Sequence, residues 1–129
     1  MSGRICLDTS AVIKIFRNDP LSKHLLAKYS RYSLAVPVVA ELLFAAKNSA
    51  KSIENIEIYS QFIDACTIIG TTRKTAEIYS DIRLQLKRNG KPIPENDIWI
   101  AAICKEHNLM IATADIHFSY IDELQLYSW

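Results

Sequence analysis

The sequence predicts an α/β fold built on a parallel sheet, and two observations lead to that prediction. Short continuous apolar runs, typical of strands covered on both faces, alternate with longer segments whose apolar residues recur at helical spacing. Strands joined by right-handed helical crossovers place their carboxyl ends along one edge of the sheet. Acidic residues repeatedly follow these strand ends, so we expect a functional site at that edge.

The expected elements begin with a strand at 5–7. A helix starts directly after Asp8, with Thr9 and Ser10 as its expected caps, and a turn at 18–20 leads into a second helix. The remaining expected elements are a strand at 33–36, helices at 37–46 and 52–66, a strand at 67–70, a helix from Thr71 or Thr72 to Asn89, a helix from Asn96 or Asp97, a strand at 109–113 and an edge strand at 124–129.

Size and composition favour one domain, 1–129, because 129 residues of which half are hydrophobic suffice for a single core. The start of the chain lacks the apolar run of a signal peptide, and no stretch has membrane-spanning length, so we expect a cytoplasmic protein. Cys6, Cys66 and Cys104 are odd in number and widely spaced among apolar residues. They are expected to be buried free thiols.

Four acidic residues fall at strand ends or on the helices that start there: Asp8, Glu41, Asp97 and Asp115. Like charges repel, so such a cluster persists only if a cation neutralises it or if the acids take up protons. Hard oxygen ligands without His or Cys select Mg²⁺ or Mn²⁺, and carboxylates are what a two-metal phosphoryl-transfer site requires. The pattern therefore indicates phosphoryl-transfer chemistry.

Some of these residues also have plain structural interpretations. Asp8 could serve only as a helix N-cap, and Glu41 could lie on a solvated helix face, although burying it unpaired among its apolar neighbours would cost several kcal/mol. A dense run of positive charge consists of Arg83, Lys87, Arg88 and Lys91. These side chains could either stabilise the C-terminal end of the expected helix through its dipole or contact phosphates. The scattered histidines, His24, His107 and His117, are expected to be structural.

These motifs resemble those of the PIN-domain ribonucleases, most closely the VapC-type toxins of bacterial and archaeal toxin-antitoxin pairs. The residues that carry the resemblance are the opening acid motif at 7–10, the helical glutamate motif at 39–42, the approach at 79–83 and 90–93, and the most specific signature at 96–102. One position departs from the family pattern, and another varies among relatives. Pro94 stands where many relatives carry glycine, and relatives vary between Asp and Asn at Asp115.

The resemblance implies a PIN-like three-layer sandwich, with a central parallel sheet of about five strands flanked by helices. It also implies a Mg²⁺- or Mn²⁺-dependent endoribonuclease toxin that inhibits translation and growth. The implied partners are an RNA substrate such as tRNA or rRNA, a cognate antitoxin and a second copy of the chain, with no membrane.

The implied site divides into three groups of residues. Asp8, Glu41 and Asp97 hold one ion, and Asp115 helps to hold a second in a two-metal hydrolysis of the phosphodiester bond. The residues that support these ligands are Ser10, Thr113 and Asn96. The residues expected to bind the RNA backbone are Arg83, Lys87, Arg88 and Lys91.

Three other classes of protein fit these motifs less well. A response-regulator receiver would carry paired acids before its phospho-acceptor strand and a late Lys near a strand end, and neither pattern appears. Aspartyl-phosphate phosphatases carry Asp-x-Asp after the first strand, and Ser10 stands where the second Asp would be. A catalytically silent PIN-fold module that binds RNA or protein remains the alternative function. The presence of all four acids disfavours it.

Overall fold

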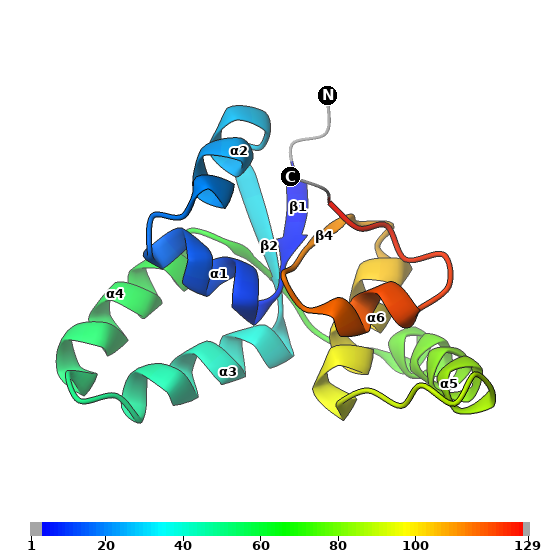
Figure 1. Ribbon diagram of the computed structural model, residues 1–129. Coiled ribbons are helices and arrows are strands. Elements are labelled where there is room, and N and C mark those ends of the chain that lie inside the picture. Colours follow the sequence, from blue (N-terminus) through cyan, green and yellow to red (C-terminus); the bar gives the residue numbers. More distant parts are fainter. Residues whose placement is uncertain (1–3, 128–129) are drawn as a thin grey trace.

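The computed structural model of the protein describes residues 4–127 and consists of a parallel sheet between two layers of helices (Figure 1). The strands are β1 (Arg4–Leu7), β2 (Arg31–Ala35), β3 (Thr67–Ile69) and β4 (Ile111–Ala112). They lie in the order β3-β2-β1-β4, and every neighbouring pair is parallel. This confirms the predicted fold class, and the described sheet has four strands where the resemblance implied about five.

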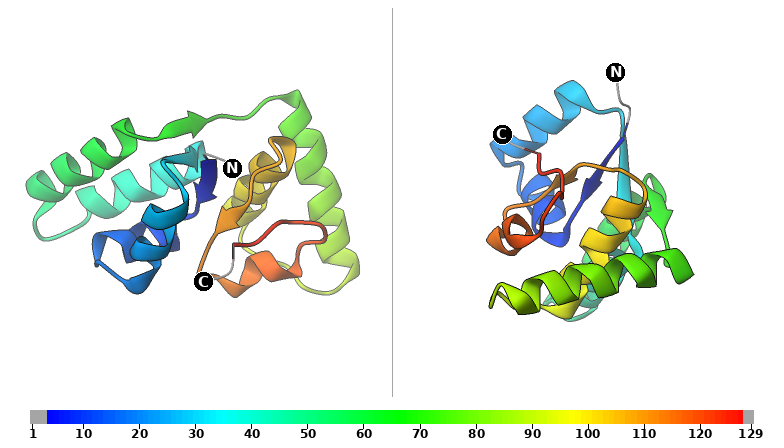
Figure 2. Two further views of the ribbon diagram at one scale, coloured as in Figure 1. Left: turned by 90° about the horizontal axis from the view of Figure 1, so that it is seen from above. Right: turned by 90° about the vertical axis from the view of Figure 1, so that its right-hand side faces the viewer.

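Helices cover both faces of the sheet. On one face lie α1 (Thr9–Phe16), α2 (Pro20–Lys28), α3 (Val36–Lys47) and α4 (Ser52–Asp64), and on the other lie α5 (Arg73–Arg88), α6 (Glu95–Glu106) and the 3₁₀ helix η1 (Ile116–Tyr120) (Figures 1 and 2). Within residues 4–127, no helix is long and apolar enough to cross a membrane.

The strand order explains this division of the helices. The chain steps from β1 to β2 to β3 in one direction and then reverses, passing β1 to reach β4. Because crossovers between parallel strands are right-handed, the helices before and after the reversal pack on opposite faces. The carboxyl ends of β1 and β4 therefore flank a crevice, the usual location of a ligand site in such sheets.

The central strand β1 is buried along all but its first residue. Residues 5–7 are 0% exposed, as expected for a strand with neighbours on both sides and helices on both faces. All three cysteines are free thiols, as predicted. Cys6 and Cys104 are buried, whereas Cys66 is only half-buried.

The predicted strand at 124–129 is reduced to a single bridge between Ile111 and Leu126. The N–H of Ile111 donates to Gln125 O at 2.9 Å, and the N–H of Tyr127 donates to Ile111 O at 2.8 Å. The pairing stops there because β4 has only two residues. Its expected first residue, Leu109, instead donates its N–H to Cys104 O and closes the end of α6. Residues 128–129 of the predicted strand lie outside the described part of the chain.

Three helix starts differ from the prediction. Helix α3 begins at Val36, which was expected to end the preceding strand, because β2 stops at Ala35. The N-cap of α1 is Asp8, whose Oδ1 accepts the N–H of Ala11 at 2.9 Å, so Thr9 and Ser10 are helical residues with free hydroxyls for other contacts. Helix α6 begins one residue earlier than expected, at Glu95, and Pro94 is its N-cap.

Gln85 of α5 ties that helix to the segment after η1. Its Nε2 donates to Tyr120 O at 3.1 Å, and its Oε1 accepts the N–H of Asp122 at 3.1 Å. The ammonium of Lys91 also lies 4.7 Å from the centre of the Tyr120 ring, close enough for a cation–π contact. Together these contacts hold the end of η1 against α5.

We expect Gln85→Ala to lower the free energy of unfolding by about 1–2 kcal/mol, because two backbone groups lose their partner. Urea unfolding followed by circular dichroism measures the change. The matched control is Gln61→Ala, since Gln61 is exposed on α4 and should change stability by less than about 0.5 kcal/mol. Equal effects of the two substitutions would contradict the role of Gln85 in holding the segment after η1 against α5.

Candidate metal centre

The structure brings the four predicted acids together around one cavity of about 290 Å³. Its lining residues are Asp8, Thr9, Ser10, Glu41, Asp97, Ile100 and Asp115. Asp8 follows β1, Asp115 follows β4, Glu41 lies on α3 and Asp97 lies in the first turn of α6. The cavity thus lies at the crevice that the strand order creates.

Asp8 is 4% exposed and held by three hydrogen bonds. Its Oδ1 accepts the Ser10 hydroxyl at 2.7 Å and the N–H of Ala11 at 2.9 Å, while Oδ2 accepts the Thr113 hydroxyl at 2.6 Å. Burial raises the pKa of Asp8, the hydrogen bonds oppose that rise, and the negative charge of Asp115 adds to it. Asp8 is therefore both a helix N-cap and a cavity residue, two interpretations that the sequence left as alternatives.

Ser10 and Thr113 connect Asp8 to the chain that carries Asp115. The Ser10 hydroxyl accepts the N–H of Ala114 at 3.0 Å, and the Thr113 hydroxyl accepts the N–H of Asp115 at 2.9 Å. These contacts hold both hydroxyl groups against the Asp8 carboxylate, and the supporting role of the two residues stays a prediction. Asn96, the third residue predicted for that role, is exposed in the first turn of α6 and is not among the residues that line the cavity.

Thr9 is a cavity residue that the sequence analysis missed. Its hydroxyl donates to Glu41 Oε1 at 2.7 Å and fixes the glutamate across 32 residues of sequence. The sequence predicts Thr9 to be a helix cap. Asp8 takes that role in the structure, which leaves the Thr9 hydroxyl available to Glu41.

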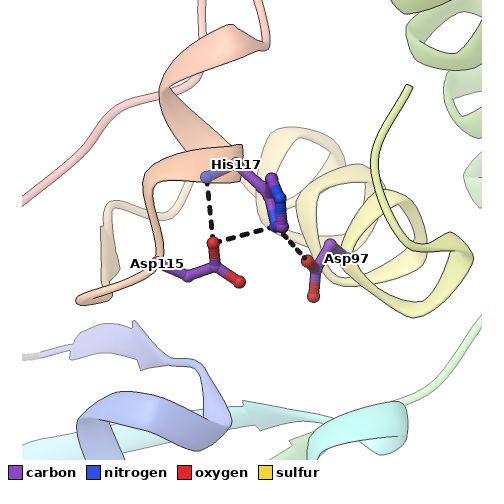
Figure 3. A group of neighbouring side chains, drawn as sticks. All are labelled: Asp97, Asp115 and His117. Atoms are coloured by element: carbon purple, nitrogen blue, oxygen red, sulfur yellow. Dashed lines mark hydrogen bonds and ion pairs between the residues drawn. The ribbon is translucent and has the colours of Figure 1, made fainter. Parts of the chain in front are cut away.

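His117 also lies at the cluster, although the sequence analysis treated it as structural (Figure 3). Its Nδ1 is 3.0 Å from Asp115 Oδ1 and 3.5 Å from Asp97 Oδ2, and its backbone N–H donates to Asp115 Oδ1 at 2.9 Å. The signal in the sequence was the spacing, since His117 follows Asp115 by two residues and can fold back onto it within a single turn.

The electrostatics of the cavity favour a cation. Burial, together with the negative charges of Asp115, Glu41 and Asp8, raises the pKa of Asp97 to about 6, and His117 partly opposes the rise. One donor atom each from Asp97, Asp115 and His117 lie within 4.8 Å of one another, a spacing that fits a single metal ion. The residues therefore fit a divalent cation.

The predicted RNA-binding residues are exposed on and just after α5. Arg83 and Lys87 help to line a second cavity, of about 370 Å³, which the start of α6 also borders. Arg83 Nη1 donates to the Tyr79 hydroxyl at 3.1 Å, and the Tyr79 ring stacks on Trp99 with 4.1 Å between ring centres. The structure thus provides a basic surface with an aromatic pair.

Asp97→Asn should remove a pH dependence from the stability of the metal-free protein. The pKa of Asp97 is about 6 in the folded protein against an ordinary value of 3.8, so the folded state holds the proton more tightly and stability falls as pH rises through this range. At about 1.4 kcal/mol per tenfold change in proton affinity, the loss is up to about 3 kcal/mol.

The measurement compares urea unfolding of the wild type and Asp97→Asn in EDTA between pH 4 and pH 7. We expect the unfolding free energy of the variant to rise relative to that of the wild type as the pH rises. A difference in unfolding free energy that stays constant across this range would contradict the raised pKa.

Comparison with known proteins identifies the family. Residues 5–124 match the PIN domain family. Ribonuclease VapC2 of Haemophilus influenzae is 30% identical over 128 residues, which cover 95% of this chain and 96% of that protein. The tRNA(fMet)-specific endonuclease VapC of Salmonella typhimurium is 24% identical over 131 residues, which cover 98% of both chains.

A similar solved structure is that of VapBC2 from Rickettsia felis bound to a DNA fragment from their promoter. It aligns with a TM-score of 0.86 at 27% identity and covers 98% of both chains. The strand order, the cavity at its reversal and these similarities agree. The chain belongs to the PIN domain family and is related to the VapC ribonuclease toxins of VapBC toxin-antitoxin systems.

Proposed function

We propose that this protein is a metal-dependent endoribonuclease toxin that hydrolyses phosphodiester bonds in RNA. The observation that carries the proposal is the convergence of four carboxylates on one cavity at the strand reversal. The 30% identity to a VapC ribonuclease over nearly the whole chain supports it. The alternative, a silent PIN-fold module that binds RNA or protein, has no need for four crowded acids.

In this proposal Asp8, Glu41 and Asp97 hold one Mg²⁺ or Mn²⁺ ion, and Asp115 helps to hold a second. Such ions would stabilise the negative charge on the attacking and leaving oxygens of an in-line displacement and would lower the pKa of a bound water molecule. The residues of the chain keep the ligands in place. Ser10 and Thr113 fix the Asp8 carboxylate, and Thr9 fixes that of Glu41.

The basic residues supply the contacts with the RNA backbone. Exposed lysine and arginine side chains attract phosphates without reading the base sequence. We assign this role to Arg83, Lys87, Arg88 and Lys91. Structured RNA of the tRNA or rRNA class is the proposed substrate, and the similarity to a tRNA(fMet)-specific endonuclease supports the tRNA class.

A cognate antitoxin and a second copy of the chain are the proposed protein partners. The similarity to the Rickettsia felis VapBC2 complex supports the antitoxin. Occupation of the acid-lined cavity by an antitoxin side chain would block the cation and RNA together. The toxin would then act on translation and growth only after the antitoxin is lost.

We expect cleavage of a labelled structured RNA with Mn²⁺ or Mg²⁺ and none in EDTA. Asp97→Asn keeps the shape of the side chain and removes its charge, so it should lose more than the roughly 10–100-fold typical of a residue that only supports a ligand. The matched control is Asp81→Asn, because Asp81 is exposed on α5. Circular dichroism verifies that each variant is folded.

Cleavage in excess chelator would contradict the role of the metal. Wild-type cleavage by folded Asp97→Asn would contradict the proposed site. Failure of the wild type to cleave RNA with either ion would favour the silent module.

A further inference from the structure

We propose that His117 is a nitrogen ligand of a divalent cation in the acid-lined cavity and makes the site prefer Mn²⁺ to Mg²⁺. The inference rests on the proposed function, which requires a cation there but is satisfied by oxygen ligands and by either ion. It concerns the one imidazole that the structure adds to the carboxylates predicted from the sequence.

The positions of the donor atoms fit one ion. The Nδ1 of His117 lies 3.0 Å from Asp115 Oδ1 and 3.5 Å from Asp97 Oδ2. Adjacent donors of a small octahedral cation, each about 2.1 Å from the ion, are about 3 Å apart. Figure 3 shows the Nδ1 edge of the imidazole turned toward both carboxylates.

The missing hydrogen bond at His117 Nδ1 indicates that this nitrogen is available to bind a metal ion. The atom is buried and makes no hydrogen bond within the described part of the chain, although Asp115 Oδ1 is only 3.0 Å away. That oxygen already accepts the backbone N–H of His117 at 2.9 Å. A buried polar nitrogen that makes no hydrogen bond is unfavourable, and a cation held between the ring and the two carboxylates would give Nδ1 a bonding partner.

The surroundings hold the ring in place. His117 belongs to η1, whose last residue, Tyr120, packs beside it with 6.3 Å between the ring centres. Gln85 and Lys91 both contact Tyr120 from α5 and the loop that follows it. The imidazole is therefore held beside Asp115 and Asp97, two residues that line the cavity, by a segment fixed at both ends, since Asp115 N-caps η1 at its start.

Ligand chemistry links the imidazole to the choice of ion. Mg²⁺ requires oxygen ligands and near-ideal octahedral geometry. Mn²⁺ also suits oxygen ligands, but as a first-row transition ion it accepts an imidazole nitrogen more readily than Mg²⁺ does. An oxygen-only site distinguishes the two ions weakly. One nitrogen ligand should therefore strengthen Mn²⁺ binding and leave Mg²⁺ binding almost unchanged.

The rival interpretation is that His117 only supports Asp115 through an ion pair. In that case removing the imidazole disturbs the carboxylate, and the affinities for both ions fall together. The two interpretations thus differ in the ratio of the Mn²⁺ and Mg²⁺ affinities and in whether nitrogen is bonded to the metal.

The test is pulsed electron paramagnetic resonance of Mn²⁺ bound to the wild-type protein, with titration calorimetry for Mn²⁺ and Mg²⁺. We expect a ¹⁴N coupling that changes to a ¹⁵N coupling on histidine labelling and is lost in His117→Asn. The same variant should bind Mn²⁺ about 10-fold more weakly and Mg²⁺ within about twofold of the wild type. His117→Gln serves as a second variant if His117→Asn unfolds.

The matched control is His107→Asn. Like His117, His107 is half-exposed beside an acid, with its Nε2 3.8 Å from Glu106 Oε1. Its substitution should leave both metal affinities and the nitrogen coupling unchanged.

Tight Mn²⁺ binding by the wild type without a nitrogen coupling would overturn the role of His117 and leave the proposed nuclease intact. An equal loss of affinity for both ions in the variant would also overturn it. Failure of the wild type to bind either ion would overturn both proposals.

Discussion

Repulsion among four carboxylates is the constraint on which the rest of the site depends. The sheet reverses its strand order between β1 and β4, and the loops and helices at that point bring Asp8, Glu41, Asp97 and Asp115 to one poorly solvated cavity. The pKa of Asp97, raised to about 6, records the cost of this arrangement. A cation removes the repulsion, so the metal-free fold carries a strain that prepares it for binding.

Short hydrogen bonds from hydroxyl groups hold the crowded acids in place. Ser10 and Thr113 donate to Asp8, and Thr9 donates to Glu41. Because Asp8 also caps α1, one residue serves both the stability of the helix and the site. The geometry of the carboxylates is therefore set before any ion arrives.

Much of the fold and the acid cluster could be predicted from the sequence, because apolar runs and strand-end acids are local patterns. The contacts of Thr9 and His117 could not, since they depend on how α1 packs on α3 and how η1 folds back on α6. The predicted strand at 124–129 is wrong for a similar reason. Leu109 completes the end of α6, which leaves β4 only two residues long and able to pair with the C-terminal segment at a single bridge.

The most direct measurement of the central claim is thermal unfolding of the wild type and Asp8→Asn across a Mn²⁺ titration at neutral pH. Asparagine still caps a helix and keeps one oxygen for Ser10 and Ala11, and its amide group can donate to the Thr113 hydroxyl, so the main change is the loss of the charge of Asp8. Without metal, the variant should melt at a higher temperature because one repulsive charge is gone. Added Mn²⁺ should raise the wild-type midpoint, as expected for a ligand that binds only the folded state, and hardly move that of the variant. Equal metal-induced shifts in the two proteins would contradict the account.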